Sequence, residues 1–295
     1  MGDNPYSVKN RSIRAESLGY ATKSKEEIFT QSRDKRIHES MVPAKALLRE
    51  SRDSETHPNS FPIIFTLDVT GSMLKIPLHL VQEGLPKIME GIMQVGVPDP
   101  AILFLAIGDH EYDNFPLQVG QFESGDEQLD MWLTRTFLEG KGGGNEGESY
   151  SLAWYFASHH TVTDSWEKRK QKGLLITIGD EPCLSSLPAR AVEEIMGVSP
   201  QASFSAKELL KKAQETYEVY HLHMLEGTAG HRSLHYWQNL LGQNCIEVAH
   251  HMDVANIIID LVKRHASESV TYTQTTGNVV VDTPSTPSKE EEILL

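Results

Sequence analysis

The chain has 295 residues, 39% of them hydrophobic and 23% charged, which is long enough for one large α/β domain with extensions or for two small domains. Its formal net charge of −14 argues against a nucleic-acid-binding protein, because phosphate is bound mainly by lysine and arginine. Two cysteines make no disulfide framework, and no apolar run reaches the roughly 18 residues of a membrane span, so we expect a soluble, cytoplasmic protein.

Three regions differ in composition. Residues 1–58 are polar and mixed in charge, and we expect a polar N-terminal arm that packs loosely on the body or stays mobile. Residues 59–267 alternate between strand and helix signals and form the body. Residues 268–295 are acidic and rich in threonine, serine and proline, which is typical of a disordered tail.

The body is predicted to contain six strands, at 63–67, 101–107, 117–122, 174–178, 218–224 and 245–249. Helical stretches separate most of them, which favours an α/β fold with a doubly wound, mostly parallel central sheet flanked by helices. The third strand follows the second after only the short loop "GDHEYDNFP", so we expect one antiparallel edge strand. Pro77 and Pro86 should divide or kink the first helical region.

Polar side chains follow the predicted strands. The first strand runs into "DVTGS", which supplies Asp68, Thr70 and Ser72. The second ends at Asp109, and the fourth is followed by two acids, Asp180 and Glu181. Ligands of open α/β sheets bind at the carboxyl ends of the strands, where these residues should meet. Carboxylates and hydroxyls are hard oxygen ligands, so we expect Mg²⁺, with Mn²⁺ or Ca²⁺ as alternatives.

Two further features bear on this interpretation. The glycine-rich loop "EGKGGGNEGESYSLA" stands between the third and fourth strands and carries Asn145 and Glu146. The "DVTGS" motif taken alone also fits an ordinary helix cap, in which Asp68 or Thr70 accepts backbone N–H groups. The metal prediction therefore depends on the whole set of loops rather than on this motif.

The first loop resembles the metal-ion-dependent adhesion site of von Willebrand factor type A (VWA) domains, whose opening motif is Asp-x-Ser-x-Ser after a hydrophobic strand. The resemblance covers roughly residues 61–266 and implies a Rossmann-like fold. It assigns the first-loop metal ligands to Asp68, Thr70 and Ser72 and the third-loop aspartate to Asp180. The second-loop threonine of the family falls nearest Asn145, so either this residue or Glu146 completes the metal shell.

The second and third loops are closer to intracellular bacterial members than to integrins. In the family the activity is binding rather than catalysis: an acidic side chain of a partner protein completes the metal shell. The resemblance thus implies a protein-interaction module that is not an enzyme, and relatives of this kind commonly work beside AAA+ ATPases or protein kinases. Glu146 and Glu181 would face the partner, and Asp109 could hold a metal-bound water.

The alternative is an enzyme similar to haloacid-dehalogenase phosphotransferases, whose ion-pump branch reads Asp-Lys-Thr-Gly-Thr. In that interpretation Asp68 is the nucleophile that forms an aspartyl phosphate, and Lys172 neutralises phosphate. The residue after Asp68 is not lysine, which argues against it. His221 and His223 share one face of a strand, but we expect buried, hydrogen-bonded histidines rather than metal ligands, and we expect Cys183 to be an inert thiol.

Overall fold

The computed structural model describes residues 5–97, 99–140, 145 and 147–277. A six-stranded sheet runs through its centre in the order β10-β9-β6-β2-β3-β4. Its strands are β2 (Phe61–Asp68), β3 (Pro100–Ile107), β4 (Leu117–Val119), β6 (Gly173–Gly179), β9 (Tyr217–Met224) and β10 (Cys245–Val248). All pairs are parallel except β3 with β4, so the predicted mostly parallel sheet and its antiparallel edge strand are confirmed.

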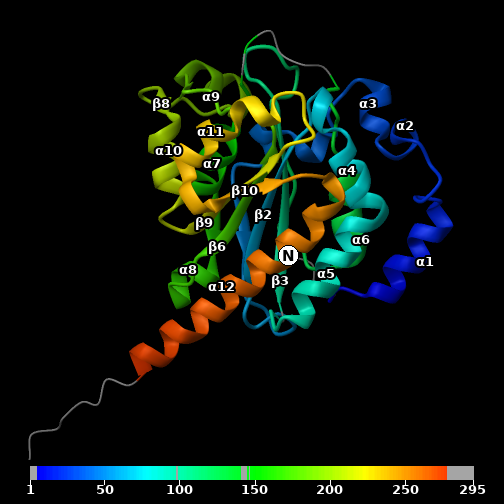
Figure 1. The fold of residues 1–295 in the computed structure, drawn as a ribbon, viewed down its shortest axis with the longest axis vertical. Coiled ribbons are helices and arrows are strands. Elements are labelled where there is room, and N and C mark those ends of the chain that lie inside the picture. Colours follow the sequence, from blue (N-terminus) through cyan, green and yellow to red (C-terminus); the bar gives the residue numbers. More distant parts are fainter. Residues whose placement is uncertain (1–4, 98, 141–144, 146, 278–295) are drawn as a thin grey trace, which may run out of the picture.

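Helices cover both faces of this sheet (Figure 1). They are α1 (Val8–Leu18), α2 (Lys25–Ile28), α3 (Thr30–Asp34), α4 (Lys75–His79), α5 (Leu85–Gln94), α6 (Asp126–Thr134), α7 (Tyr150–His159), α8 (Asp164–Arg169), α9 (Ala189–Met196), α10 (Ala206–Ala213), α11 (Gly230–Leu241) and α12 (Val254–Gly277). Two small sheets lie apart from the main one: β1 (Arg49–Ser51) pairs in parallel with β5 (Thr161–Thr163), and β7 (Ser186–Leu187) pairs antiparallel with β8 (Phe204–Ser205).

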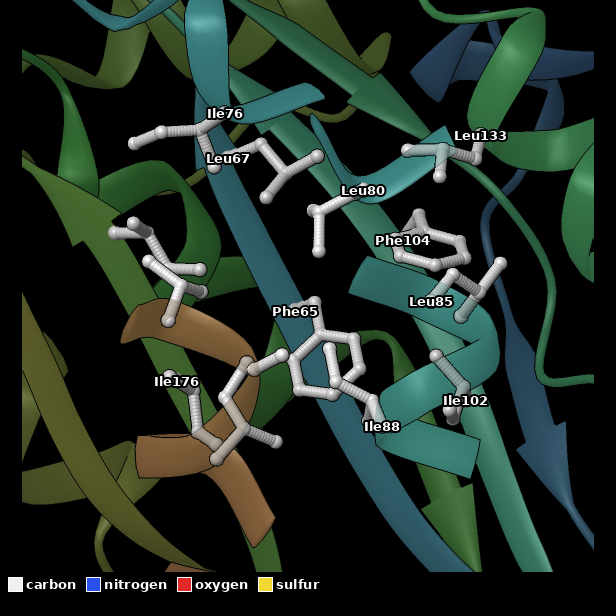
Figure 2. Close-up of a cluster of buried hydrophobic side chains, with 14 of the residues drawn as sticks. Phe65, Leu67, Ile76, Leu80, Leu85, Ile88, Ile102, Phe104, Leu133 and Ile176 are labelled. Carbon is white, nitrogen blue, oxygen red and sulfur yellow. The ribbon is translucent and has the colours of Figure 1, made fainter. Parts of the chain in front are cut away.

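The central strand β2 is buried along its whole length because its side chains alternate between two cores. Phe65 and Leu67 face the core that contains α4, α5, α6 and α12. Figure 2 shows both side chains in this core together with Leu80 and Leu85. Ile64 faces the second core, which contains α7, α9, α10 and α11. Two buried faces explain why this strand reads as a continuous apolar run.

The first helical region is divided as predicted. Helix α4 contains Pro77, a π-helical segment follows at Leu80–Gly84, and α5 then begins with Pro86 in its first turn. Pro86 has no N–H for the i→i−4 bond, so a regular α-helix cannot continue from α4 through Pro86. The wide turn of the π-helix accommodates the break.

The N-terminal region differs from the expected loose arm. Phe29 and Met41 are fully buried in the core beside β2, and β1 pairs with β5 of the body. Arg11 of α1 is 2% exposed and forms an ion pair of 3.0 Å with Asp130 of α6. The described part of residues 1–58 is therefore packed onto the body, through apolar residues too scattered to produce a periodic signal.

The last helix, α12, reaches Gly277 and so extends into the segment 268–295 that we expected to be disordered. Residues 278–295 lie outside the described part of the chain. Among the described residues, no helix is long and apolar enough to cross a membrane.

Candidate metal centre

The predicted site lies where the strand order of the main sheet reverses. From β2 the chain adds β3 and β4 on one side, and it later adds β6, β9 and β10 on the other. In open α/β sheets such a reversal leaves a crevice outside the carboxyl ends of the two central strands. Asp68 is the last residue of β2, and Asp180 follows directly after β6, so both carboxylates stand at the carboxyl ends of these two neighbouring strands.

Asp68 is held in one orientation by its own loop and by α7. Its Oδ1 accepts hydrogen bonds from the Thr70 backbone N–H at 2.9 Å and from the Thr70 hydroxyl at 2.6 Å. Its Oδ2 accepts a bond of 3.0 Å from the hydroxyl of Tyr150, the first residue of α7. Asp68 is 1% exposed, so its carboxylate is out of contact with solvent. These three donors supply the hydrogen bonds that water would otherwise give.

Asp180 is fixed in a similar way. Its Oδ1 accepts a hydrogen bond of 2.9 Å from the Ser72 hydroxyl, and its Oδ2 accepts one of 3.0 Å from the Ala229 backbone N–H. Ser233 of α11 donates to the Asp180 backbone carbonyl. The first loop thus bonds to both aspartates, Thr70 to Asp68 and Ser72 to Asp180. The structure brings together these four predicted residues.

Two glycines allow this close packing. A Cβ at Gly179 would overlap the Tyr150 hydroxyl and lie 3.0 Å from Asp68 Oδ2, and a Cβ at Gly227 would overlap the Asp180 carboxylate. Only glycine lets another group approach the backbone this closely at these positions.

Glu148 is a member of the site that sequence reasoning missed. It is 3% exposed, and its Oε2 is buried without a hydrogen-bond partner. Its backbone N–H donates to Pro182 O at 2.9 Å, and its carbonyl accepts from the Leu184 N–H at 3.0 Å, so it is fixed against the loop after β6. Its place at the end of the glycine-rich loop, two residues before α7, was the available signal.

Burial and mutual repulsion raise the pKa values of the carboxylates. Burial is the larger cause for both Asp68, whose pKa rises to about 7, and Glu148, whose pKa rises to about 10. The charge of Asp180 adds to the shift at Asp68, and the charge of Asp68 adds to that at Glu148. None of Asp68, Glu148 and Asp180 takes part in an ion pair with a described lysine or arginine.

These carboxylates and hydroxyls are hard oxygen donors of the kind that bind a divalent cation, but the carboxylate oxygens of Asp68, Glu148 and Asp180 do not all lie within 4.8 Å of one another. Buried carboxylates without a basic partner are costly, and a cation between them removes that cost. Asp68 Oδ2 and both carboxylate oxygens of Asp180 accept one hydrogen bond each and keep a further lone pair. The hydroxyls of Thr70 and Ser72 are oxygen ligands, and Glu148 Oε2 has no hydrogen-bond partner. Mg²⁺, Mn²⁺ and Ca²⁺ are the ions that such oxygens prefer.

Asp109 and Asn145 lie together in a neighbouring loop cluster. Asp109 is fully buried, its Oδ1 accepts from the Glu111 N–H at 2.8 Å, and its Oδ2 has no partner. The Asn145 amide donates to Glu111 Oε2 at 3.0 Å, while its oxygen Oδ1 is buried and unbonded. Burial raises the pKa of Asp109. Glu146, predicted as the alternative to Asn145, lies outside the described residues.

Glu181 stands at the edge of the site rather than in it. Its carboxylate forms an ion pair of 3.1 Å with Arg232 of α11, and its backbone carbonyl accepts a bond of 2.9 Å from the Trp237 indole N–H. The position agrees with a surface role, although the carboxylate is shared with a positive side chain.

Three other predicted roles can be compared with the structure. His223 Nε2 donates to Gly230 O at 2.6 Å, and its Nδ1 accepts from His221 Nε2 at 3.3 Å. His221 Nδ1 in turn bonds the Thr177 hydroxyl at 2.8 Å, so every ring nitrogen of this buried pair is used within the fold. Burial raises the pKa of the Cys183 thiol to about 12, as expected of an inert thiol.

The role considered for Lys172 as a phosphate-neutralising group is contradicted. Lys172 directly precedes β6, whereas Asp180 directly follows it, so the two residues lie at opposite ends of this strand. Its Nζ donates to Gln214 O at 2.7 Å and pairs with Glu218 at 3.5 Å.

No protein-family model matches the chain, and no curated protein matches it. Among solved structures, the pilus adhesin SpaC from Lactobacillus rhamnosus GG in its open conformation is similar over 70% of this chain, with 11% identity and a TM-score of 0.47. Proximal thread matrix protein 1 from the mussel byssus is similar over 70% of this chain, with 10% identity and a TM-score of 0.44. This chain spans 30% of the adhesin and 48% of the mussel protein.

Proposed function

We propose that the chain is a protein-interaction module of the VWA type that depends on a divalent cation, most simply Mg²⁺. Asp68, Thr70, Ser72 and Asp180 hold the cation, with Asn145 as the second-loop ligand that the resemblance assigns. We add Glu148, whose buried Oε2 lacks a partner, as a further ligand that moves toward the two aspartates when the cation binds. The module is not an enzyme; the bound cation accepts a carboxylate from a partner protein.

One observation carries this proposal. Two buried aspartates and two hydroxyls meet at the strand-order reversal, hydrogen-bonded to one another and without a described basic partner. A helix cap accounts for the bonds from Thr70 to Asp68, but not for the pairing of the same loop with Asp180 on another strand. A bound cation accounts for both.

The cation also explains how an acidic chain could bind an acidic partner. A net charge of −14 repels a carboxylate, whereas a bound divalent ion reverses the sign of the local field. Tyr112 in the loop after β3 is 57% exposed and offers an aromatic contact near Asp109. We therefore propose a partner that inserts an Asp or Glu side chain, an AAA+ ATPase or a protein kinase system being the kind of partner that the resemblance implies.

Calorimetric titration of Mg²⁺ and Mn²⁺ tests the site. Asp68→Ala and Asp180→Ala should weaken binding at least tenfold, because each removes a carboxylate that the cation needs. Ser72→Ala changes only a half-buried hydroxyl, so it should keep the fold while still weakening binding. Asp34→Ala, which removes an exposed acid of α3 paired with Arg33, is the matched control and should bind as wild type.

Unchanged affinity in all three site variants would refute the proposed site. The same proteins should also be assayed with a generic aryl phosphate. Cation-dependent turnover that disappears in Asp68→Ala would identify Asp68 as a nucleophile and would replace the proposal with the phosphotransfer alternative.

A further inference from the structure

A second group of possible metal ligands lies beside the loops after β9 and β10. Glu226 stands in the turn after β9, and His250 and His251 stand at the start of the short 3₁₀ helix η6 (His251–Asp253) after β10. Within the described ranges, this is the one group of three or more His, Cys, Asp or Glu side chains whose donor atoms all lie within 4.8 Å of one another. It contains no residue of the Asp68 site.

The geometry of the group is compact. Glu226 Oε1 lies 2.7 Å from His251 Nδ1, and Oε2 lies 3.5 Å from His250 Nε2. The two imidazole rings lie next to each other, with centroids 4.3 Å apart and planes inclined by 32°. Zinc bound at about 2.0–2.2 Å with tetrahedral angles separates its ligand atoms by roughly 3.4 Å. The distances from Glu226 to the two histidines, 2.7 and 3.5 Å, lie on either side of that value, and one donor atom from each of the three residues lies within 4.8 Å of the others.

We propose that Glu226, His250 and His251 form a binding site for a borderline transition-metal ion such as Zn²⁺, independent of the oxygen site at Asp68. Two imidazoles and a carboxylate are ligands of zinc, cobalt and nickel rather than of Mg²⁺. Three protein ligands leave the fourth position for water or for a partner side chain.

His250 must change its hydrogen bonding to take part. Its Nδ1 accepts from the Met252 N–H at 3.3 Å, so the neutral ring carries its proton on Nε2, facing Glu226. When a metal ion binds Nε2, that proton moves to Nδ1 and the long contact with Met252 is lost. His251 needs the same kind of exchange, because its Nδ1–H donates to the Glu226 carboxylate and this proton must move to Nε2 before Nδ1 can bind the metal ion.

A buried histidine of α4 borders the group. His79 of α4 lies edge-on to His251, with ring centroids 5.5 Å apart, and is 8% exposed. His79 closes the inner side of the group, whereas His250 remains accessible with its side chain 54% exposed.

A metal ion here would also brace the candidate cation site. The turn that carries Glu226 continues to Ala229, whose N–H holds Asp180 Oδ2 at 3.0 Å. The His pair belongs to the segment after β10, and Leu225 of the same turn bonds to Val248 O at 2.9 Å. Binding at Glu226, His250 and His251 would cross-link the two loops next to Asp180.

The test is titration of Zn²⁺ into the full chain with Mg²⁺ in large excess, so that the oxygen site is already occupied. We expect wild type to bind one equivalent, and His251→Gln and Glu226→Gln to bind at least tenfold more weakly. His235→Gln, which changes an exposed histidine of α11, is the matched control and should bind as wild type. Co²⁺ should give the intense visible absorption of a low-coordinate nitrogen and oxygen site in wild type and not in His251→Gln.

Equal Zn²⁺ affinity in wild type, His251→Gln and Glu226→Gln would overturn the proposal. So would an equal loss in His235→Gln, because that would indicate nonspecific binding to histidines. Mg²⁺ affinity of the same variants, measured without Zn²⁺, shows that they are folded. It also separates failure of this site from failure of the Asp68 site.

Discussion

At the residue scale, Glu148 offers the most direct test of the proposed cation site. Its pKa of about 10 means that the carboxyl is protonated at pH 7 when no cation is bound. Glu148→Gln replaces a neutral acid with an amide of the same shape, so the free energy of unfolding should change by less than about 1 kcal/mol. Loss of a ligand oxygen should nevertheless weaken Mg²⁺ binding about tenfold.

Calorimetry in buffers of different ionisation enthalpy measures this directly. A cation that binds Glu148 must displace its proton, so wild type should release protons on binding Mg²⁺ at pH 7 and Glu148→Gln should release fewer. Equal proton release by the two proteins would show that Glu148 is not a ligand, and Asp68 would then be the remaining source.

The same residues show what a sequence can say about a site. Asp68, Thr70 and Ser72 follow one strand at fixed spacing, and Asp180 follows another, so strand prediction alone placed them together. Glu148 was missed because its place at the end of the glycine-rich loop is a weak signal, and its position depends on backbone bonds to Pro182 and Leu184, which lie far along the chain. Asn145 bonds to Glu111 rather than to a residue of the first loop, a pairing that no local spacing signals.

At the element scale, the N-terminal region depends on the contact between α1 and α6. Arg11 and Asp130 are 2% and 3% exposed, and breaking one side of such a buried pair typically costs about 3 kcal/mol. Asp130 keeps its ion pair of 3.0 Å with Arg14, so Arg11→Ala should lower the free energy of unfolding, measured in urea, by a smaller amount of about 2 kcal/mol. Arg33→Ala removes a pair with Asp34 in which Arg33 is 61% exposed, so it should cost less than about 1 kcal/mol.

Equal effects of Arg11→Ala and Arg33→Ala would mean that the buried pair between α1 and α6 stabilises the protein no more than the exposed pair within α3 does. The elements also differ in how well they could be predicted. The sheet strands are continuous apolar runs because both faces are buried, which sequence alone reveals. Buried Arg11, Phe29 and Met41 come from short helices and turns without periodicity, so the packing of this region could not be predicted.

At the scale of the whole molecule, an acidic chain concentrates buried carboxylates at the reversal of its strand order. In the cation-free protein Asp68 and Glu148 have folded-state pKa values of about 7 and 10, above their ordinary values of 3.8 and 4.5. Groups with raised folded pKa values stabilise the fold at low pH, and this contribution is lost as pH rises through those folded values. A bound cation prefers the ionised forms and therefore reverses this trend.

The last prediction follows from that reversal. An Asp68 pKa of about 7 makes the ionised fraction fall about tenfold between pH 8 and pH 6, so Mg²⁺ affinity should fall at least tenfold over this range. The rise in melting temperature on adding Mg²⁺ should accordingly be larger at pH 8 than at pH 6. In Asp68→Asn the rise in melting temperature on adding Mg²⁺ should be small, and it should not depend on the ionisation of residue 68.

Histidines also titrate near this pH range, and comparing wild type with Asp68→Asn removes their effect. Burial lowers the pKa values of His79, His110 and His221, so their contribution to stability is lost as pH falls below about 6.5, opposite to the carboxyls. Both proteins contain these histidines, so the difference between wild type and Asp68→Asn reports the carboxylate site alone. A Mg²⁺ effect of equal size at pH 6 and pH 8 in wild type would contradict a site built around Asp68.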